Sequence, residues 1–240
     1  MSEQASSVGV AAFFDLDDTL LAGDTDALWH AYLRQSGRAG ILEELWATWY
    51  LRRSRNGRSD AATYVAIQTR AIAGQLVEDV RRWYEECFER LAEERLFPEA
   101  GRLVETHRRR GHRLVLCTGL NTLCCEAIQR RLGLHAAIGT ELEIVDGRCT
   151  GKIVGSLCVG LEKAARVERY AVEQGVDLGV SYAYGDSHAD LPMLEAVGHP
   201  TAVNPDPVLK IVAREREWPL LRFVPAPGGP PARREASRAP

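Results

Sequence analysis

Several features are scarce or missing in this chain of 240 residues. Lysine occurs only at positions 152, 163 and 210 among 30 basic residues, so a lysine inside a motif is more informative than usual. No run of about 18 apolar residues is present, which argues against a membrane-spanning helix. The polar start MSEQASS leads into a short apolar stretch that meets acidic residues at once, so we predict no secretory signal.

The six cysteines lack the spacing of a metal site or a disulfide framework. None belongs to a C-x-x-C pair, and Cys124 and Cys125 are adjacent. We therefore expect reduced or buried thiols in a cytoplasmic protein. The other four are Cys87, Cys117, Cys149 and Cys158.

The composition is that of an ordinary globular protein. Hydrophobic residues make up 45% of the chain, and the formal net charge is -3. This charge balance gives no indication of a broad nucleic-acid surface, so we expect no nucleic-acid partner. The length suits one large domain, or a core domain that carries a smaller insert.

The apolar pattern divides the chain into unlike parts. Residues 8–14 form a short apolar run, typical of a buried strand, and residues 24–97 show only helical spacing. From residue 98 strands and helices alternate, which predicts an α/β fold with a mostly parallel sheet covered on both faces. We expect a core of residues 8–23 and 98–224, an all-helical insert of residues 24–97 (the helical insert), and a disordered tail of residues 225–240.

Further strands are predicted at 113–117, 181–184, 201–203 and 220–224, and Asp146-Gly147 predicts a hairpin between 141–145 and 148–154. Helices are predicted at about 99–110, 121–132 and 161–174, and a short one after Pro192.

Acidic residues follow two of these strands. Asp15 and Asp17 come directly after the first strand, and a regular strand would point both side chains the same way. Ligands of open α/β sheets sit beyond the carboxyl ends of strands, and paired carboxylates there suit Mg²⁺. The alternative is a turn or helix cap, which Asp and Thr also favour.

The segment Gly185-Asp186-Ser187-His188-Ala189-Asp190 follows the strand at 181–184. If a helical turn begins at residue 187, Asp186 and Asp190 can face one site. An Asp-initiated turn is the alternative. We interpret His188 as a solvent-facing loop residue, because no second histidine has ligand spacing to it.

Two weaker signals could bind an anion. Thr118-Gly119 follows the strand at 113–117, where a hydroxyl and backbone N–H groups can hold phosphate oxygens. Lys163 lies near the start of a predicted helix. A common loop and a solvated surface charge are the respective alternatives.

Together and in this order, these motifs resemble the haloacid dehalogenase-like hydrolases. The motifs are DLDDTL at 15–20, CTG at 117–119, Lys163 and GDSHADLPML at 185–194, and the resemblance covers residues 8 to 223. The stretches at 20–26 and 194–221 are similar to the branch that includes phosphoserine phosphatase and histidinol-phosphate phosphatases. The resemblance implies a Rossmann-like core with the helical insert as a cap domain.

The resemblance also implies a mechanism. Asp15 would attack phosphorus and become an aspartyl phosphate, and Asp17 would act as acid and then as base. Mg²⁺ would be held by the Asp15 and Asp186 carboxylates and the Asp17 backbone carbonyl. Asp190 would support the site through water or Lys163.

Thr118, Gly119 and Lys163 would bind the phosphoryl oxygens. An acid at position 17 favours phosphatase turnover over the persistent phosphoenzyme of the transport ATPases, and it argues against dehalogenation. Ala189 and Leu120 depart from the phosphoserine phosphatase pattern, which often has Asn and Gly there, so the substrate stays open.

The helical insert should choose the substrate. Asp24 lies where phosphoserine phosphatases have a Glu for the substrate amine, although it could instead cap a helix. Arginines at 52, 53, 55 and 58 could attract an anion or form a solvated helix end. The aromatic group Trp46, Trp49, Tyr50 and Tyr64 could form the core of the insert or line a pocket for a lipid phosphate.

Three hypotheses follow. The first is a phosphatase for a small amino-bearing phosphate monoester, such as histidinol phosphate or phosphoserine. The second is a phosphatase for a lysophospholipid or polyol phosphate. The third is a catalytically silent binding protein on the same scaffold, against which the intact acids and Lys163 argue. The oligomeric state is not indicated by the sequence.

Overall fold

A six-stranded sheet forms the centre of the computed structural model, which describes residues 9–41, 45, 49 and 61–227. Its order is β3-β2-β1-β6-β7-β8, and every neighbouring pair is parallel. The predicted α/β class with a mostly parallel sheet is therefore confirmed. The strands are β1 (Ala11–Phe14), β2 (Arg113–Asn121), β3 (Ala136–Thr140), β6 (Tyr182–Gly185), β7 (His199–Val203) and β8 (Leu220–Leu221).

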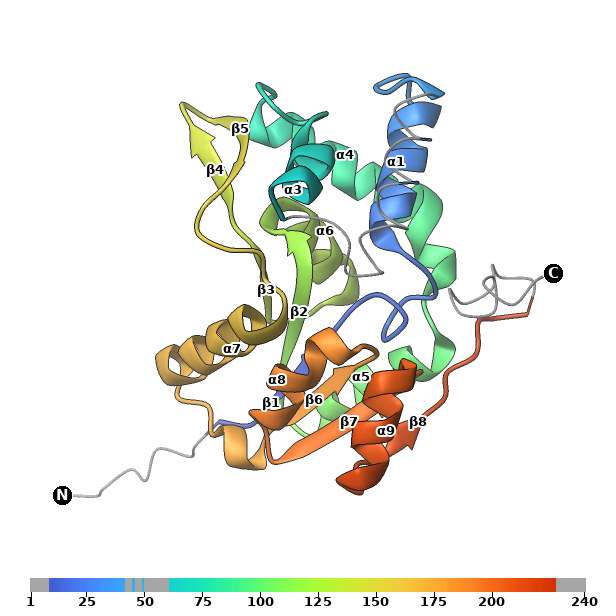
Figure 1. Cartoon of the computed structure of the whole chain (residues 1–240), viewed down its shortest axis with the longest axis vertical. Helices are drawn as coiled ribbons and strands as arrows, with labels where there is room; N and C mark the ends of the chain where they lie inside the picture. The colour runs from blue at the N-terminus through green and yellow to red at the C-terminus, as the bar shows by residue number, and fades with distance from the viewer. Residues whose placement is uncertain (1–8, 42–44, 46–48, 50–60, 228–240) are drawn as a thin grey trace.

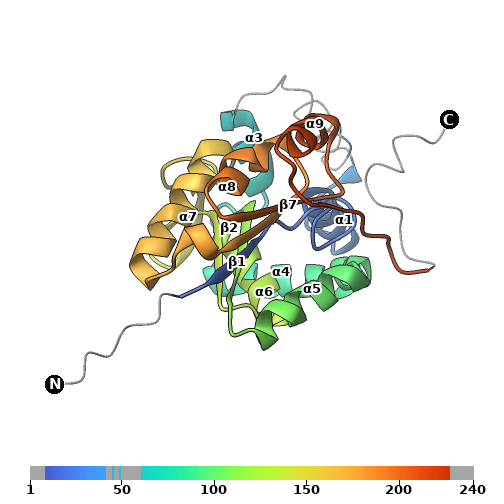
Figure 2. The ribbon, with the colours of Figure 1, turned by 90° about the horizontal axis from the view of Figure 1, so that it is seen from below.

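Helices cover both faces of the sheet (Figure 2). Strand side chains alternate between faces, so Ala12 and Phe14 pack into one apolar cluster and Ala11 and Phe13 into another. The first cluster includes residues of α5 (Pro98–Arg109) and α6 (Thr122–Leu132). The second includes residues of α7 (Gly160–Gln174), α8 (Leu191–Glu195) and α9 (Pro207–Glu215). Burial on both sides explains why β1 reads as a continuous apolar run.

The described part of the helical insert lies between β1 and α5 in the chain and stands on one side of the sheet (Figure 1). Its helices are α1 (Thr25–Gln35), α3 (Ala61–Thr69) and α4 (Val77–Cys87), followed by a π-helical turn at Phe88–Ala92 and a 3-10 turn at Glu93–Arg95. Pro98 occupies the first turn of α5, where its missing N–H is harmless. The assignment of residues 24–97 as a separate domain stays a prediction.

A hairpin of β4 (Leu142–Val145) and β5 (Arg148–Ile153) pairs with the helical insert (Figure 1). The Gly74 N–H donates to the Cys149 carbonyl at 2.7 Å, and the Cys149 N–H donates to the Gln75 carbonyl at 3.0 Å. Gly151 has φ +86, and an added Cβ would lie 2.9 Å from Ala73 Cβ. Only glycine permits this conformation and this approach at low cost. The hairpin and the insert are thus joined through their backbones.

The sequence missed two elements. β3 has the sequence AAIGT, which is too small and weakly apolar to stand out, and it pairs with β2 at the edge of the sheet. α9 begins after Asp206, whose side chain accepts from the Leu209 N–H at 2.7 Å, with Pro207 in the first turn. This Asp-Pro start is a recognisable helix signal. The last strand is shorter than predicted, because the Phe223 N–H donates to the Asn204 side chain instead.

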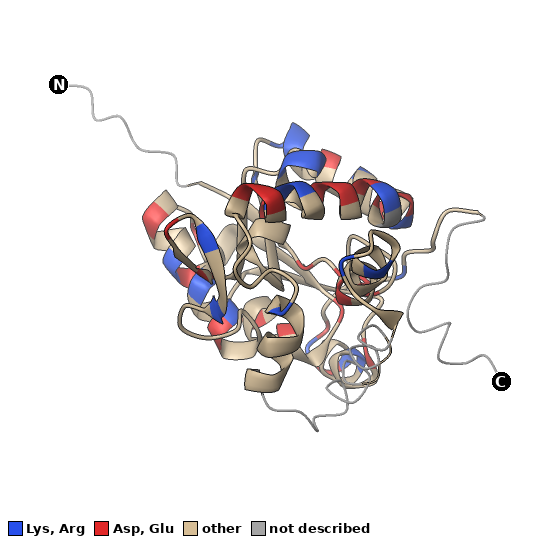
Figure 3. Cartoon of the chain, turned by 90° about the horizontal axis from the view of Figure 1, so that it is seen from above, with Lys and Arg blue, Asp and Glu red and all other residues tan. Residues whose placement is uncertain are grey.

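Other expectations concern the whole chain. All six cysteines are free and buried, as predicted. Among the described residues, no helix is both long enough and apolar enough to span a membrane. Lys and Arg are interspersed with Asp and Glu on several of the described helices (Figure 3). The tail beyond residue 227, the arginines at 52, 53, 55 and 58, Trp46 and Tyr50 lie outside the described residues.

Candidate active site

The candidate site lies where three adjacent strands end. β1 sits between β2 and β6, and the chain order reverses at this point, since β2 and β3 follow on one side and β6 to β8 on the other. Asp15 follows β1, Asp186 follows β6, and Thr118 and Gly119 lie near the end of β2. Such a switch point opens a crevice beyond the carboxyl ends of the strands.

Three buried carboxylates meet in this crevice. Asp15, Asp186 and Asp190 each offer an oxygen atom, and these atoms lie within 4.8 Å of one another. The sequence interpretation required Asp15 and Asp186 to come close enough to share an ion, and the structure brings them together. It adds Asp190 to the same cluster, whereas the family resemblance implied only a supporting role for that residue.

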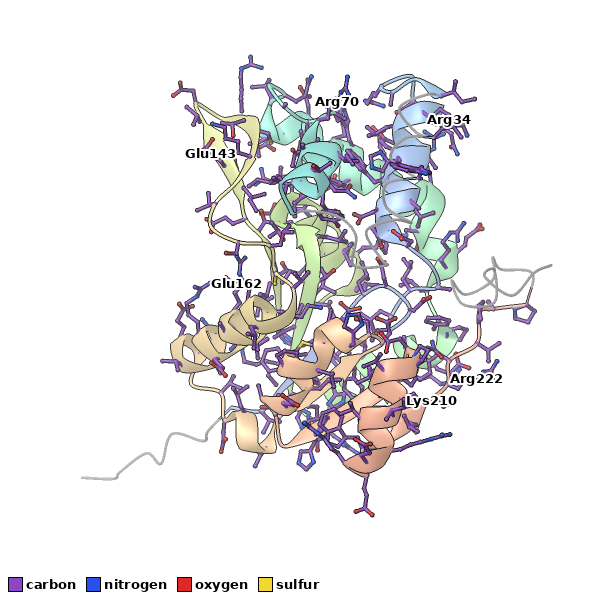
Figure 4. All side chains as sticks on the ribbon, in the orientation of Figure 1. Arg34, Arg70, Glu143, Glu162, Lys210 and Arg222 are labelled. Atoms are coloured by element: carbon purple, nitrogen blue, oxygen red, sulfur yellow. The ribbon has the colours of Figure 1, made fainter. Side chains whose placement is uncertain are left out.

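Lys163 neutralises part of this charge. It lies in the first turn of α7 and is 3% exposed, so the alternative of a solvated surface charge is wrong. Its Nζ donates to Asp15 Oδ1 at 2.8 Å and to Asp190 Oδ1 at 2.6 Å. Burial alone would lower the pKa of Lys163, but the two carboxylates outweigh burial and hold this pKa well above its usual range. Lys210, by contrast, lies exposed on α9 (Figure 4).

A short 3-10 turn (His188–Asp190) positions Asp190. Asp190 Oδ2 accepts from the Ser187 N–H at 3.2 Å, and the Ser187 side chain accepts from the Asp190 N–H, so the two residues form a capping box. The Ser187 hydroxyl also lies 3.0 Å from Asp190 Oδ2. An added Cβ at Gly185 would lie 2.7 Å from Asp190 Cβ, so glycine is needed for this approach. The predicted turn at residue 187 therefore brings Asp186 and Asp190 to one site. His188 is exposed, as interpreted, and its Nδ1 lies 3.0 Å from Asp206 Oδ2.

The environment makes Asp15 unusually basic for a carboxylate. Burial outweighs the opposing effect of Lys163 and, together with the nearby Asp190 charge, raises the pKa of Asp15 to about 6. A cation bound at this cluster would favour the ionised form, which is the form a nucleophile requires.

Asp17 faces a different partner. β1 ends at Phe14, so Asp15 to Asp17 lie beyond the regular strand, and the alternation expected from strand geometry does not extend to them. The Asp17 carboxylate accepts from the Thr25 N–H at 3.0 Å and from the Thr25 hydroxyl. Thr25 is the first residue of α1, where the helix dipole also favours a negative charge. The helical insert therefore holds the second acid of the motif.

Thr118 and Gly119 lie at the same edge of the sheet. Phe14 pairs with Leu116 in the β1–β2 register, which places Thr118 just beyond the level of Asp15. Thr118 is buried, and the Gly119 carbonyl accepts from the Thr140 hydroxyl at 2.7 Å. Their role in phosphate binding stays a prediction.

A cleft extends from this edge into the helical insert. The empty space within it is about 440 Å³, which includes space that is open to solvent. Thr25, Asp26 and Trp29 of α1, Tyr64 and Gln68 of α3, and Gly119 of β2 line it. Thr25 thus touches both the cleft and the acid Asp17.

Asp24 is not among the residues that line this cleft. Its side chain accepts from the Ala27 N–H at 3.1 Å and caps α1, the alternative considered from the sequence. Asp26, two residues further on, does line the cleft, and it accepts from the Tyr64 hydroxyl at 2.6 Å. Among the predicted aromatic residues, Tyr64 lines the cleft and Trp49 is 57% exposed.

Several residues around the site escaped the sequence analysis. Asn204 donates through Nδ2 to the Asp18 carbonyl at 2.9 Å, and the Asp206 N–H donates to the Asp186 carbonyl at 2.7 Å. Asn204 and Asp206 both follow β7, so their position just after a strand was the sequence signal that could have identified them. Thr25 and Gln68 had no comparable signal, because their place depends on how the helical insert packs.

The residues present fit a divalent metal ion. Three buried carboxylates beside one ammonium group provide an all-oxygen donor set with excess negative charge. Mg²⁺ prefers such ligands and keeps several of its waters. We expect Asp15 and Asp186 to hold it.

The family model for the haloacid dehalogenase-like hydrolases matches residues 12–195. The chain belongs to this family, and it is an enzyme of the phosphatase class. It is 31% identical over 217 residues to a histidinol-phosphatase of Neisseria meningitidis, covering 88% of this chain and 98% of that protein. It is 32% identical over 223 residues to a phosphoserine phosphatase of Mycobacterium tuberculosis, covering 89% of this chain and 70% of that protein.

Solved structures agree with this assignment. A protein of unknown function from Bordetella pertussis is similar with a TM-score of 0.82 and 32% identity, covering 90% of this chain and 99% of that one. A substrate-bound phosphoserine phosphatase has a TM-score of 0.64 at 20% identity, covering 89% and 92% of the two chains, and supports the fold alone. The resemblance predicted from the sequence motifs is confirmed.

Proposed function

We propose that the protein is a Mg²⁺-dependent phosphomonoesterase that forms an aspartyl phosphate on Asp15. The observation that carries this proposal is the buried cluster of Asp15, Asp186 and Asp190 around Lys163. Within a phosphatase family, a buried carboxylate next to a fixed ammonium group and a metal-type donor set suits attack on phosphorus.

Asp15, Asp17 and Thr25 have different roles in the proposed reaction. Asp15 attacks phosphorus through a carboxylate oxygen, and the ester oxygen leaves with the bonding electron pair. Asp17 gives its proton to that leaving oxygen and then takes a proton from the water that hydrolyses the aspartyl phosphate. Thr25 holds the Asp17 carboxylate between these steps.

Binding of the phosphoryl group falls to neighbouring residues. Lys163 supplies a fixed positive charge against Asp15, and Thr118 and Gly119 offer a hydroxyl and backbone N–H at the end of β2. Mg²⁺, held by Asp15, Asp186 and the Asp17 carbonyl, would neutralise phosphoryl charge when bound. Asp190 keeps Lys163 and the turn after β6 in place.

For the substrate, we propose a small amino-bearing phosphate monoester such as histidinol phosphate or phosphoserine. The acid Asp26 in the cleft can attract an amine, and relatives that match most of the chain are named for these two substrates. A cytoplasmic location suits such a metabolic role and stays a prediction, as does the absence of a nucleic-acid partner.

The test is release of phosphate from phenyl phosphate. Wild-type protein should release it with Mg²⁺ and not with excess chelator, and Asp15→Asn should lose about 10⁴-fold or more of this activity. Hydroxylamine should trap an acyl phosphate from wild type only. No release by wild type from any ester tested, or equal release by Asp15→Asn, would instead favour the catalytically silent binding protein.

A second substrate class has one observation in its favour. Leu120, Leu142, Ile153 and Leu157 give the cleft an apolar wall, which suits the acyl chain of a lysophospholipid phosphate. A lysophosphatidate and glycerol phosphate therefore belong in the substrate panel.

A further inference from the structure

The cleft contains a buried hydrogen-bond donor that the phosphatase mechanism does not use. Trp29 is 3% exposed, and its Nε1–H finds no hydrogen-bond partner among the described residues. An indole N–H can only donate, so no alternative assignment satisfies it. Buried polar groups are nearly always paired, and an exception next to a binding cleft points to a missing ligand.

A second donor lies on the facing helix. Gln68 of α3 lines the same cleft, and its Nε2 is also buried without a partner among the described residues. α1 and α3 therefore each bury one unpartnered donor in a side chain that lines the cleft. Two donors from separate helices mark a place where a ligand presents acceptor atoms.

The aromatic ring of Trp29 is firmly placed. It stacks on Tyr84 with ring centroids 4.1 Å apart and on Tyr32 with centroids 5.7 Å apart. The Tyr84 hydroxyl in turn accepts from Asn121 Nδ2 at 2.7 Å, which ties α4 to the end of β2. The indole N–H is thus held in a fixed direction by its neighbours, as selective recognition requires.

The charge of the cleft restricts the acceptor. Asp26 is the single charged side chain among the described residues that line the cleft. None of these residues is a lysine or arginine that could pair with a substrate carboxylate. A substrate carboxylate would meet the like charge of Asp26 without a compensating cation. An uncharged nitrogen or oxygen acceptor avoids this repulsion.

We propose that Trp29 and Gln68 recognise the leaving group of the substrate by donating hydrogen bonds to an uncharged acceptor. This selects amino-alcohol phosphates that carry a neutral ring nitrogen or a hydroxyl over phosphorylated amino acids. The inference rests on the proposed function and refines its substrate class. A site built to hydrogen-bond a ligand rejects analogues that lack the partner atom, because its own donors are then left buried and unpaired.

The experiment compares three esters in the presence of Mg²⁺. Histidinol phosphate carries a neutral acceptor, phenyl phosphate carries none, and phosphoserine carries a carboxylate. Wild type should prefer the first in kcat/KM. Trp29→Phe and Gln68→Met should each lower kcat/KM for histidinol phosphate about 10- to 100-fold, and change that for phenyl phosphate less than about 3-fold.

Trp83→Phe is the matched control. Trp83 lies on α4 outside the cleft, with the Arg38 guanidinium 4.6 Å from its ring, so its replacement should leave all three rates unchanged. Gln68→Met carries the test alone if Trp29→Phe does not fold.

Three outcomes would overturn the inference: equal losses on histidinol phosphate and phenyl phosphate, no loss on either, or a wild-type preference for phosphoserine or phenyl phosphate over histidinol phosphate. A wild type inactive on every ester would refute the proposed function itself, which is a different result.

Discussion

The two halves of the candidate site differ in the polar groups that they bury, which are bonded charges at the strand ends and uncharged donors in the cleft. At the strand ends, Lys163 bonds to both Asp15 and Asp190, and Asp190 also closes a capping box. In the cleft, Trp29 and Gln68 each leave a donor without a partner among the described residues. The bonded charges are already organised for one reaction, whereas the unpaired donors are available to a ligand. We therefore expect the sheet to define the chemistry and the helical insert to define the choice of substrate.

Removal of the acid–base group should give the largest effect. Asp17→Asn keeps the size of the side chain but cannot exchange a proton, so kcat should fall about 10²- to 10⁴-fold, while substrate binding persists. Steady-state kinetics on phenyl phosphate, where the cleft contributes little, isolates this loss at the strand-end half. A near-wild-type kcat would remove Asp17 from the acid–base role.

Metal binding should stabilise the strand-end half. Mg²⁺ at about 100 times its Kd should add about 2.7 kcal/mol to the free energy of unfolding, because only the folded chain gathers the carboxylates. Asp186→Asn should lose most of this gain in a thermal melt, and His188→Gln, with an exposed ring nearby, should keep it. Equal shifts in both variants would place the ion elsewhere.

Thr25 bonds to Asp17 and also lines the cleft, so Thr25 variants test whether the two halves of the site act independently. Thr25→Val removes the hydroxyl that donates to Asp17 and should lower kcat about 10-fold on every ester. Thr25→Ser keeps the hydroxyl and should restore most of the rate. A change confined to KM, or to esters that fill the cleft, would show that Thr25 serves the cleft rather than Asp17.

The sequence revealed the half of the site that the sheet organises. Asp15 and Asp186 each follow an apolar strand, and adjacent parallel strands end together, so their meeting follows from local pattern and topology. The hydrogen bonds of Asp17 could not be foreseen in the same way. The path of residues 15–25 after β1 brings Asp17 to Thr25, and the placement of α3, whose Tyr64 hydroxyl donates to Asp26 of α1, brings Gln68 to the cleft. Such contacts depend on tertiary structure, as does the finding that Asp26 rather than Asp24 lines the cleft.

The smallest expected effect concerns the sheet beneath the site. His107 of α5 packs edge-on against Phe14, and its Nε2 lies 2.8 Å from the Tyr184 hydroxyl. Burial, with help from nearby His112 and Arg110, lowers the pKa of His107 to about 4. The imidazole is therefore neutral in the folded protein, while an unfolded chain takes up a proton below about pH 6.5.

The folded state binds fewer protons than the unfolded state between these two pKa values, so stability falls as the pH drops from 6.5 towards 4. We expect a loss on the order of 1–2 kcal/mol from this group, measured by urea unfolding at several pH values. His107→Gln should be less stable at pH 7 but show a flatter profile over this range, and His188→Gln should keep the wild-type slope.

No described residue that lines the cleft is a histidine. Acid should therefore weaken the sheet while leaving the relative preference between phosphoserine and phenyl phosphate, neither of which carries an imidazole, unchanged. A preference between these two esters that shifts with the same midpoint would show that the two halves are coupled.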